Sequence, residues 1–263
     1  MLKQRTITGA FITLVIALVL CFSKYSVVMN VFCGLLAIMA IYEMLNATGW
    51  HSLPILFAYA FLIGITYPIQ FSFFRYIAIA SLIIGIALFV YMMIRMKSVK
   101  LDGNPIVLFI CLLIVVYIKC LNDLRLGEHG LFLCIAAICI GFLSDIFAYF
   151  IGKGFGRHKL AKTLSPNKTI EGSLGGLLLT MIIMTAVFAI YSNKNGLSIN
   201  YFKIVLVLIV SIVLGQFGDL SMSTVKRIVG IKDYGKILPG HGGILDRFDS
   251  LLFIVPFIYI IFR

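Results

Sequence analysis

The sequence contains little charge, and acidic side chains are its scarcest charged group. Asp and Glu together number 10 in 263 residues against 22 Lys and Arg, and the four types make up 12% of the chain. A soluble globular domain carries about 25% charged residues. Here 62% of the residues are hydrophobic, and the mean hydropathy is +1.10. This composition excludes an ordinary soluble domain and indicates an integral membrane protein.

The sequence also lacks the cysteine spacing of a metal or redox site. No two of its six cysteines form a C-x-x-C pair, and all of them lie in or at the ends of apolar segments. We therefore expect ordinary buried thiols and neither disulfides nor metal ligands. They are Cys21, Cys33, Cys111, Cys120, Cys134 and Cys139.

Alternating polarity, which marks the strands of a membrane barrel, is missing as well, and the apolar runs are long and continuous. The sequence therefore predicts an all-α, polytopic integral membrane protein with about nine transmembrane helices and two polar loops. We expect the first apolar run to be a membrane span and not a cleaved signal, because no small-x-small site follows it. The predicted spans are 7–23, 25–45, 53–71, 74–94, 104–121, 130–151, 173–192, 203–225 and 249–262.

The net charge of +12 has a simple explanation in such a protein. In a soluble chain it would suggest nucleic acid, but Lys and Arg collect in the cytoplasmic loops of membrane proteins. With the N-terminus inside, most of the 22 basic residues fall on the inner side. We therefore expect no nucleic-acid partner, a multi-pass protein of the cell membrane, and both large polar loops on the cytoplasmic face.

The acidic residues divide the chain into two regions of one membrane domain. Residues 1–130 hold few acids and are predicted to be a transmembrane scaffold, whereas 131–263 hold six and are predicted to be the catalytic region. Glu43 is the exception in the first region, and the sequence leaves open whether it is a pocket residue or an interfacial carboxylate. The six are Asp145, Glu171, Asp219, Asp233, Asp246 and Asp249.

The first polar loop contains the segment Ser-Pro-Asn-Lys-Thr-Ile-Glu-Gly, which starts at Ser165. Pro166 can initiate a helix, and Lys168 and Thr169 would then lie in its first turn, where free N–H groups favour phosphate. Glu171 could hold Lys168, cap the turn or contact a metal. Helix capping with small-residue packing is the alternative to a phosphate site.

The second polar loop follows a predicted span that ends near Asp219. Ser223 and Lys226 come four and seven residues later, so an acid, a hydroxyl and a cation share one helix face. A structural salt bridge between Asp219 and Lys226 is the alternative to a functional site. Charge is costly at the edge of a bilayer, which favours function.

A tight turn and two further acids complete this loop. The sequence Pro-Gly-His-Gly-Gly at 239–243 cannot be helical throughout, and it presents His241 for a phosphate contact or an acid–base role. Asp246 and Asp249 follow with i, i+3 spacing, so both carboxylates are expected to point the same way. Together with Asp219 they would provide the oxygen ligands that Mg²⁺ prefers.

At these residues the chain resembles the phosphatidate cytidylyltransferases, also called CDP-diacylglycerol synthases. Their signature runs from a Ser through Lys-Arg, Lys-Asp and His-Gly-Gly to Asp-Arg, an apolar residue and Asp. The Ser-Pro-x-Lys-Thr-x-Glu-Gly segment is similar too, except that Asn167 replaces a residue that is usually basic. The signature positions here are Ser223, Lys226, Arg227, Lys232, Asp233, Gly235, Leu238, Pro239, His241, Gly242, Gly243, Asp246, Arg247 and Asp249.

The resemblance implies a reaction in which CTP and phosphatidate give CDP-diacylglycerol and pyrophosphate with Mg²⁺ as cofactor. Asp219, Asp246 and Asp249 would hold the metal, and Lys226 and His241 would act with them in catalysis. CTP, phosphatidate and membrane lipids are the implied partners. Phosphate contacts are implied for Ser165, Lys168, Thr169, Ser223, Arg227, Lys232 and Arg247.

Three other interpretations fit parts of the sequence. One is another CTP-dependent membrane lipid transferase or a polyprenol kinase. A second is an ion-coupled transporter with Asp145 and Asp219 as intramembrane ligands, but the polar residues collect in one half instead of in two repeats. A third is a membrane scaffold, which would have no need of the acidic cluster. Glycine-rich helix faces also make a homodimer an expectation.

Overall fold

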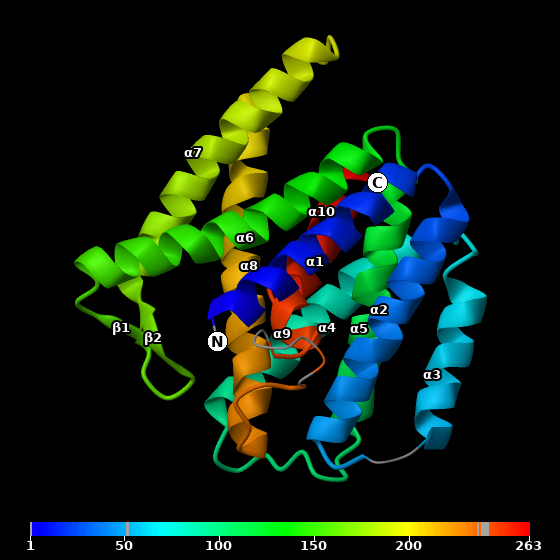
Figure 1. Cartoon of the computed structure of the whole chain (residues 1–263), viewed down its shortest axis with the longest axis vertical. Helices are drawn as coiled ribbons and strands as arrows, with labels where there is room; N and C mark the ends of the chain where they lie inside the picture. Colours follow the sequence, from blue (N-terminus) through cyan, green and yellow to red (C-terminus); the bar gives the residue numbers. More distant parts are fainter. Residues whose placement is uncertain (1, 51–52, 236, 238–241) are drawn as a thin grey trace.

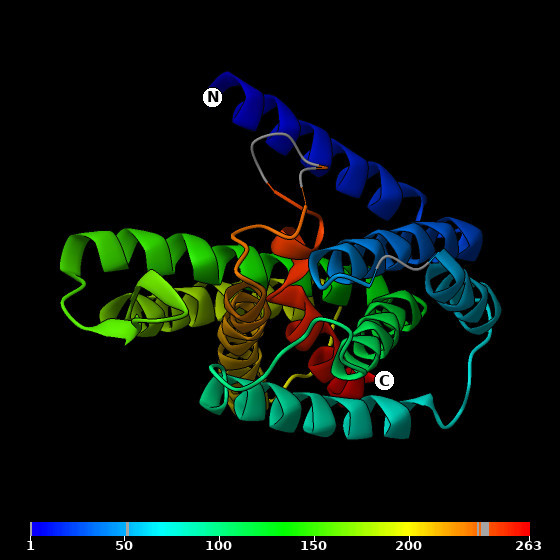
Figure 2. The ribbon, with the colours of Figure 1, turned by 90° about the horizontal axis from the view of Figure 1, so that it is seen from below.

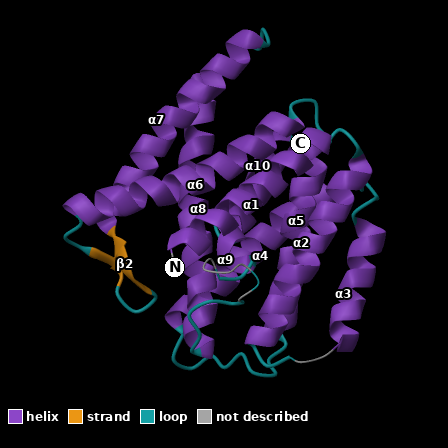
Figure 3. Ribbon diagram, in the orientation of Figure 1, coloured by secondary structure: helices purple, strands orange, loops and turns teal. Residues whose placement is uncertain are grey.

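The computed structural model describes residues 2–50, 53–235, 237 and 242–263, and of residues 2–8 and 11–13 only the backbone. Figure 1 shows that these residues form a bundle of helices of different tilt, and Figure 3 shows that the strands form a single hairpin at one end. The elements, in order, are α1 (Leu2–Phe22), α2 (Ser26–Ala47), α3 (Leu53–Thr66), α4 (Phe74–Ile94), α5 (Ile106–Arg125), α6 (Gly130–Phe155), β1 (Lys159–Ala161), β2 (Ser165–Thr169), α7 (Ile170–Lys194), α8 (Tyr201–Val229), α9 (Leu245–Phe248) and α10 (Leu251–Phe262).

The helices confirm the predicted all-α membrane fold. Among the described residues, six helices are long and apolar enough to cross a bilayer, namely α2, α4, α5, α6, α7 and α8. Every one of the nine predicted spans contains a helix, but α3 has 14 residues and α10 has 12. Both are shorter than the roughly 20 residues that a crossing needs. The count of nine spans is therefore not established.

Helix α10 shows why an apolar run is not always a lipid-facing span. It packs against α4, α5, α6 and α8, and eight of its side chains are buried. A helix that is apolar on every side is stable either in lipid or in a protein core. In this protein α10 lies in the core, and the short segment before it, from α9 to Ser250, therefore reaches the middle of the bundle.

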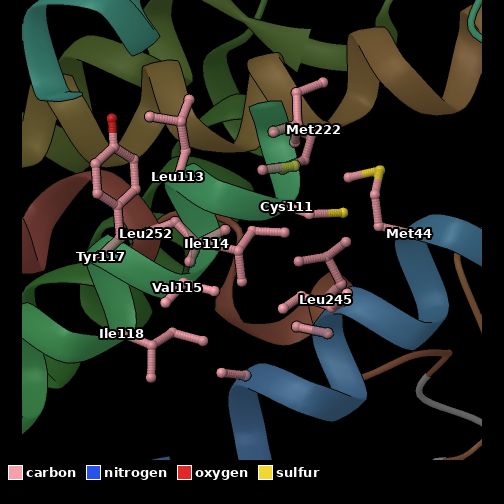
Figure 4. Close-up of a cluster of buried hydrophobic side chains, with 14 of the residues drawn as sticks. Met44, Cys111, Leu113, Ile114, Val115, Tyr117, Ile118, Met222, Leu245 and Leu252 are labelled. Carbon is pink, nitrogen blue, oxygen red and sulfur yellow. The ribbon is translucent and has the colours of Figure 1, made fainter. Parts of the chain in front are cut away.

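Residues from both halves of the sequence build a shared hydrophobic core, one of two clusters of buried side chains among the described residues. Figure 4 shows Met44 of α2, Cys111 of α5, Met222 of α8 and Leu245 of α9 gathered in one cluster. All of these side chains are at most 2% exposed. The N-terminal region therefore packs directly against the elements that carry the second polar loop.

Helices α6 and α7 form an arm at the side of this bundle. They pack along each other and lie side by side in Figure 2, and Figure 1 shows the end of α7 extending beyond the other helices. Large apolar side chains on α7 are exposed, among them Leu174 (57%), Ile182 (59%) and Ile190 (69%). In water such a surface would be unfavourable, so it is the surface expected to face lipid.

The loop between α6 and α7 folds differently from the prediction. Residues Ser165–Thr169 form strand β2, which pairs antiparallel with β1 through Lys159↔Thr169 and Ala161↔Ser165. The predicted helix start at Pro166 is therefore wrong, and Lys168 does not lie in a first helical turn. Helix α7 begins at Ile170 because the side chain of Thr169 acts as its N-cap and accepts a hydrogen bond from Gly172 N at 3.1 Å.

Replacing Thr169 by Ala is expected to destabilise the first turn of α7 by about 1 kcal/mol, the usual cost of a lost N-cap. Hydrogen exchange should then speed up at the Gly172 amide. Thr169→Ser keeps the hydroxyl and is the matched control, which should leave exchange near the wild-type rate. Equal exchange in the Ala and Ser variants would contradict the capping role.

Candidate active site

Two lysine–aspartate ion pairs connect the polar loops to the helices. Lys168 on β2 pairs with Asp219 on α8. Lys226, near the end of α8, pairs with Asp246 on α9 with an Nζ–Oδ1 distance of 2.8 Å. The alternative of a structural pair between Asp219 and Lys226 is thus wrong. Both motifs found in the sequence meet at α8, because each pair joins that helix to one of the two polar loops.

Ser223 lies on the same face of α8 as Asp219, as the spacing predicts. Its Oγ is 3.5 Å from Asp219 Oδ1, and the residue is 9% exposed. Lys226 continues the stripe by one turn and there reaches across to α9. The three side chains therefore share one helix face, as predicted. Lys226, however, pairs with Asp246 of α9 and not with Asp219, the partner that local spacing suggests.

Asp246 is the most densely bonded carboxylate of the site. Besides the ion pair with Lys226, its Oδ2 accepts hydrogen bonds from the backbone N–H groups of Tyr234 at 2.8 Å and Gly243 at 2.9 Å. Its side chain is 5% exposed. The carboxylate thus fixes α8, the loop after α8 and the start of α9 relative to one another.

The three acids predicted to bind a metal do not form a single cluster. Asp219 faces Lys168, Asp246 faces Lys226, and Asp249, which is 8% exposed, accepts a hydrogen bond from Ser250 N at 2.8 Å. Within the described part of the chain, no group of three or more His, Cys, Asp or Glu side chains is close enough to hold a metal. Two of the carboxylates are instead paired with different lysines, which the sequence did not predict.

A cavity of about 630 Å³ lies between α6, the hairpin and the helices α7 and α8. Its wall is polar on the side of the hairpin, where cations and hydroxyls gather. Ligand sites in proteins have volumes of about 300–1,000 Å³. The lining residues are Asp145, Ala148, Tyr149, Gly152, Lys153, Gly156, Lys159, Leu160, Ser165, Asn167, Lys168, Thr169, Ser173, Gln216 and Asp219.

A second cavity, of about 320 Å³, lies next to the first along α6, against α9 and the start of α10. Asp145 and Tyr149 line both cavities, so these two side chains of α6 mark the place where the cavities adjoin. The lining residues of the second cavity are Gly141, Phe142, Asp145, Ile146, Tyr149, Phe150, Asp246, Arg247, Asp249, Ser250 and Leu251.

Asp145 is the member of this site that sequence reasoning left without a role. The available signal was an acid placed well inside an apolar run, which is costly in a membrane and marks functional positions. The structure adds the reason for its position, because α6 carries it to the junction of the two cavities.

The charges of the site influence one another across the cavities. Partial burial lowers the pKa of the Lys168 ammonium, and the carboxylates of Asp145 and Asp249 oppose that shift. Lys226 acts on the same group in the lowering direction. Acids and cations from α6, β2, α8 and the segment after α9 therefore belong to one electrostatic environment.

Three of the other predicted phosphate ligands line the cavities, and one of them also packs against neighbouring backbone. Ser165 and Thr169 line the larger cavity, and Arg247 lines the smaller one. Thr169 also packs closely against two glycines, because a Cβ at Gly152 or Gly156 would lie within 3 Å of its Oγ1. Close packing against Thr169 thus explains two of the glycines before the hairpin, Gly152 and Gly156.

Two predicted ligands lie on the surface near the hairpin and the second loop. Arg227 is exposed, and its Nε donates to the carbonyl of Leu164 at 3.1 Å, which holds the hairpin against α8. Lys232 is exposed and lines neither of the two cavities. His241 lies outside the described residues, together with the other residues of 238–241.

Glu171 closes the base of the hairpin and does not contact Lys168. It accepts hydrogen bonds from the backbone of Arg157 at 3.1 Å and of His158 at 3.2 Å, and it pairs with His158 Nδ1 at 2.6 Å. These contacts are exposed and fix the path of the chain from α6 into β1. Of the three roles that the sequence left open for Glu171, this is closest to capping.

Comparison with known proteins finds the family that the sequence motifs resemble, and the similarity extends over almost the whole chain. The sequence model of the Cytidylyltransferase family matches residues 3–263. The phosphatidate cytidylyltransferase of Bacillus subtilis (strain 168) is 34% identical over 267 residues, covering 98% of this chain and 96% of its own. The phosphatidate cytidylyltransferase of Staphylococcus aureus (strain COL) is 35% identical, covering 99% and 98%. The chain belongs to the cytidylyltransferase family.

Proposed function

We propose that the protein is a phosphatidate cytidylyltransferase, which transfers CMP from CTP to phosphatidate and forms CDP-diacylglycerol and pyrophosphate. The observation that carries the proposal is the pair of cavities that adjoin at Asp145 and Tyr149. The larger one carries cations and hydroxyls on its hairpin side and has the volume of a ligand site, and the smaller one combines Arg247 with apolar side chains. The names of the relatives support the same substrates.

The larger cavity is suited to the nucleotide. Lys153, Lys159 and Lys168 converge on it from α6, β1 and β2. Their ammonium groups can neutralise a triphosphate, and the hydroxyls of Ser165 and Thr169 add donors for phosphate oxygens. We therefore assign CTP to this cavity.

The smaller cavity is suited to the lipid phosphate. Arg247 supplies a guanidinium, which binds phosphate through paired N–H donors. Phe142, Ile146 and Phe150 of α6 line the same cavity, and they are 43%, 47% and 65% exposed. Such an apolar margin lets the acyl chains remain in the bilayer while the head group enters the site from the side.

The reaction requires positioning and charge neutralisation more than a protein nucleophile. An oxygen of the phosphatidate phosphate attacks the α-phosphorus of CTP, a new P–O bond forms, and the bond to the β-phosphate oxygen breaks. Pyrophosphate leaves with that electron pair. Lys168 lines the larger cavity, and Lys226 lies 2.8 Å from Asp246 of the smaller one. Both cations could stabilise the charge that builds up on the phosphates, once their paired aspartates accept other partners.

The donor set of the site fits Mg²⁺, although no three carboxylates meet among the described residues. Mg²⁺ is usually held by one or two carboxylates, with substrate phosphates and water as its other ligands. One or two of the carboxylates of Asp219, Asp246 and Asp249 would hold it, since the three do not form one cluster. When bound, the ion would neutralise charge on the phosphates and polarise the α-phosphate.

We further propose that the site faces the cytoplasm, where CTP is available. The excess of Lys and Arg in the segments on that side supports this orientation, since basic residues collect in cytoplasmic loops. The hairpin and the loop after α8 carry many of these residues.

The proposed function is tested with purified protein in phosphatidate-containing vesicles. With CTP and Mg²⁺, we expect equal amounts of pyrophosphate and CDP-diacylglycerol. Omitting Mg²⁺ or replacing CTP by ATP should remove both products. Release of CDP with a phosphorylated alcohol would instead indicate a kinase, and a folded protein that forms no CDP-diacylglycerol would refute the proposal.

A further inference from the structure

We propose that Glu43, on α2 in the N-terminal half, is a positioning residue that holds Asp246 in its working geometry. This inference depends on the proposed function for its catalytic meaning. Its structural basis lies in contacts between residues about 200 positions apart in the sequence.

Glu43 is neither an interfacial carboxylate nor part of the wall of the two cavities. It is 2% exposed, and it lies among the buried residues of α2. Its Oε1 accepts a hydrogen bond from Ile244 N at 3.0 Å, and its Oε2 accepts one from Leu245 N at 2.8 Å. A buried carboxylate with both oxygens engaged by backbone donors has a defined partner and a fixed position.

These two N–H groups belong to the start of α9, which extends from Leu245 to Phe248. The first N–H groups of a helix have no partner within the helix, and a negative charge near them is favourable. Glu43 provides such a charge from another helix. It therefore fixes where α9 begins and in which direction it points.

Asp246 is the next residue along the chain. Its position depends on the same short segment, because Gly243 N donates to its Oδ2 on one side while Lys226 holds its Oδ1 on the other. The order of contacts is therefore Glu43, the backbone of 244–245, Asp246 and Lys226. We therefore expect a displacement of this segment to disturb the contact between Asp246 and Lys226.

Two glycines leave room for Glu43. A Cβ at Gly243 would lie 2.5 Å from Oε2 of Glu43, and a Cβ at Gly235 would also collide with the carboxylate. Neither glycine has a positive φ. Their role is thus the close approach of two loop segments to one buried carboxylate, and the carboxylate in turn joins both segments to α2.

The first test is Glu43→Gln, with Glu128→Gln as the control. Glutamine has the same shape but a single acceptor oxygen, so its amide NH₂ would face a backbone N–H. We expect kcat to fall about 10- to 100-fold while the KM for CTP changes by less than about threefold, because Lys168 and the larger cavity remain intact. Glu128 is exposed in the loop between α5 and α6, and its variant should keep wild-type kcat.

A second test separates positioning from general stability. Gly235→Ala should lower kcat in the wild-type background, since the methyl group displaces the Glu43 carboxylate. In a Glu43→Ala background the same methyl group enters vacated space, so the further loss should be less than about threefold. If Gly235→Ala instead lowers kcat by the same factor in the wild-type and Glu43→Ala backgrounds, the two residues act independently and the proposal is overturned.

Hydrogen exchange distinguishes failure of this inference from failure of the proposed function. The amides of Ile244 and Leu245 should be protected in the wild type and should exchange at least about tenfold faster in Glu43→Gln. If the wild type makes no CDP-diacylglycerol, the proposed function fails and this measurement still tests the contact. Unchanged exchange, or a folded Glu43→Gln protein with wild-type kcat, would overturn the role of Glu43.

Discussion

Asp246→Asn is expected to lower kcat by about 10³-fold, the largest effect in this site. An amide in place of this carboxylate cannot accept from both Lys226 on one oxygen and two backbone N–H groups on the other. Whichever way it is turned, its NH₂ group faces a donor. The expected loss corresponds to about 4 kcal/mol of transition-state stabilisation, since about 1.36 kcal/mol corresponds to a tenfold change in rate.

The measurement is the rate of CDP-diacylglycerol formation per folded molecule, with circular dichroism used to determine the folded fraction. Asp102→Asn is the matched control, because Asp102 is exposed in the loop between α4 and α5 and lines neither cavity. It should retain activity within about twofold. A folded Asp246→Asn protein with kcat within threefold of wild type would remove Asp246 from the catalytic machinery.

The sequence predicts the membrane fold well, because a long apolar run has few alternatives to a helix in lipid. It is less informative about which runs contact lipid. The run at 249–262 is as apolar as the others, yet α10 is enclosed by four helices. Hydropathy measures only how strongly a side chain avoids water. A protein core and a bilayer both remove apolar side chains from water, so hydropathy does not distinguish them.

Local spacing also has a limit in the site itself. It places Asp219, Ser223 and Lys226 on one face of a helix, and the structure keeps that face. It cannot indicate that the partner of Asp219 comes from a strand 51 residues earlier, or that Lys226 turns to α9. These pairings depend on how the hairpin and α9 pack against α8, which is a property of the tertiary structure.

Glu43 shows the same limit for the division into scaffold and catalytic regions. Judged by its neighbours in the sequence, it is an isolated acid in an apolar helix. Its partners, Ile244 and Leu245, lie in the second polar loop. The separation of the chain at about residue 130 remains a prediction, while the shared core and this contact join the two regions around the same segment.

Lys168→Gln is expected to lower kcat/KM for CTP by about 100-fold, corresponding to about 2.7 kcal/mol of lost transition-state stabilisation. Lys168 lines the larger cavity and pairs with Asp219 across it. The variant loses a cation that can contact phosphate, and it leaves the Asp219 carboxylate without its ammonium partner. Both effects disfavour a triphosphate in that cavity, so KM should rise and kcat should fall.

The hairpin offers a control with the same charge change. Lys162 lies between β1 and β2, is exposed, and does not line the larger cavity. If the hairpin attracts CTP only through its overall positive charge, Lys162→Gln and Lys168→Gln should lose similar activity, and both losses should disappear at high salt. If Lys168 binds phosphate directly, Lys162→Gln should stay within about twofold of wild type, and the defect of Lys168→Gln should persist at 0.5 M salt. Initial rates over a range of CTP concentrations at low and high salt decide between the two, because a partly buried contact is screened far less than an exposed charge.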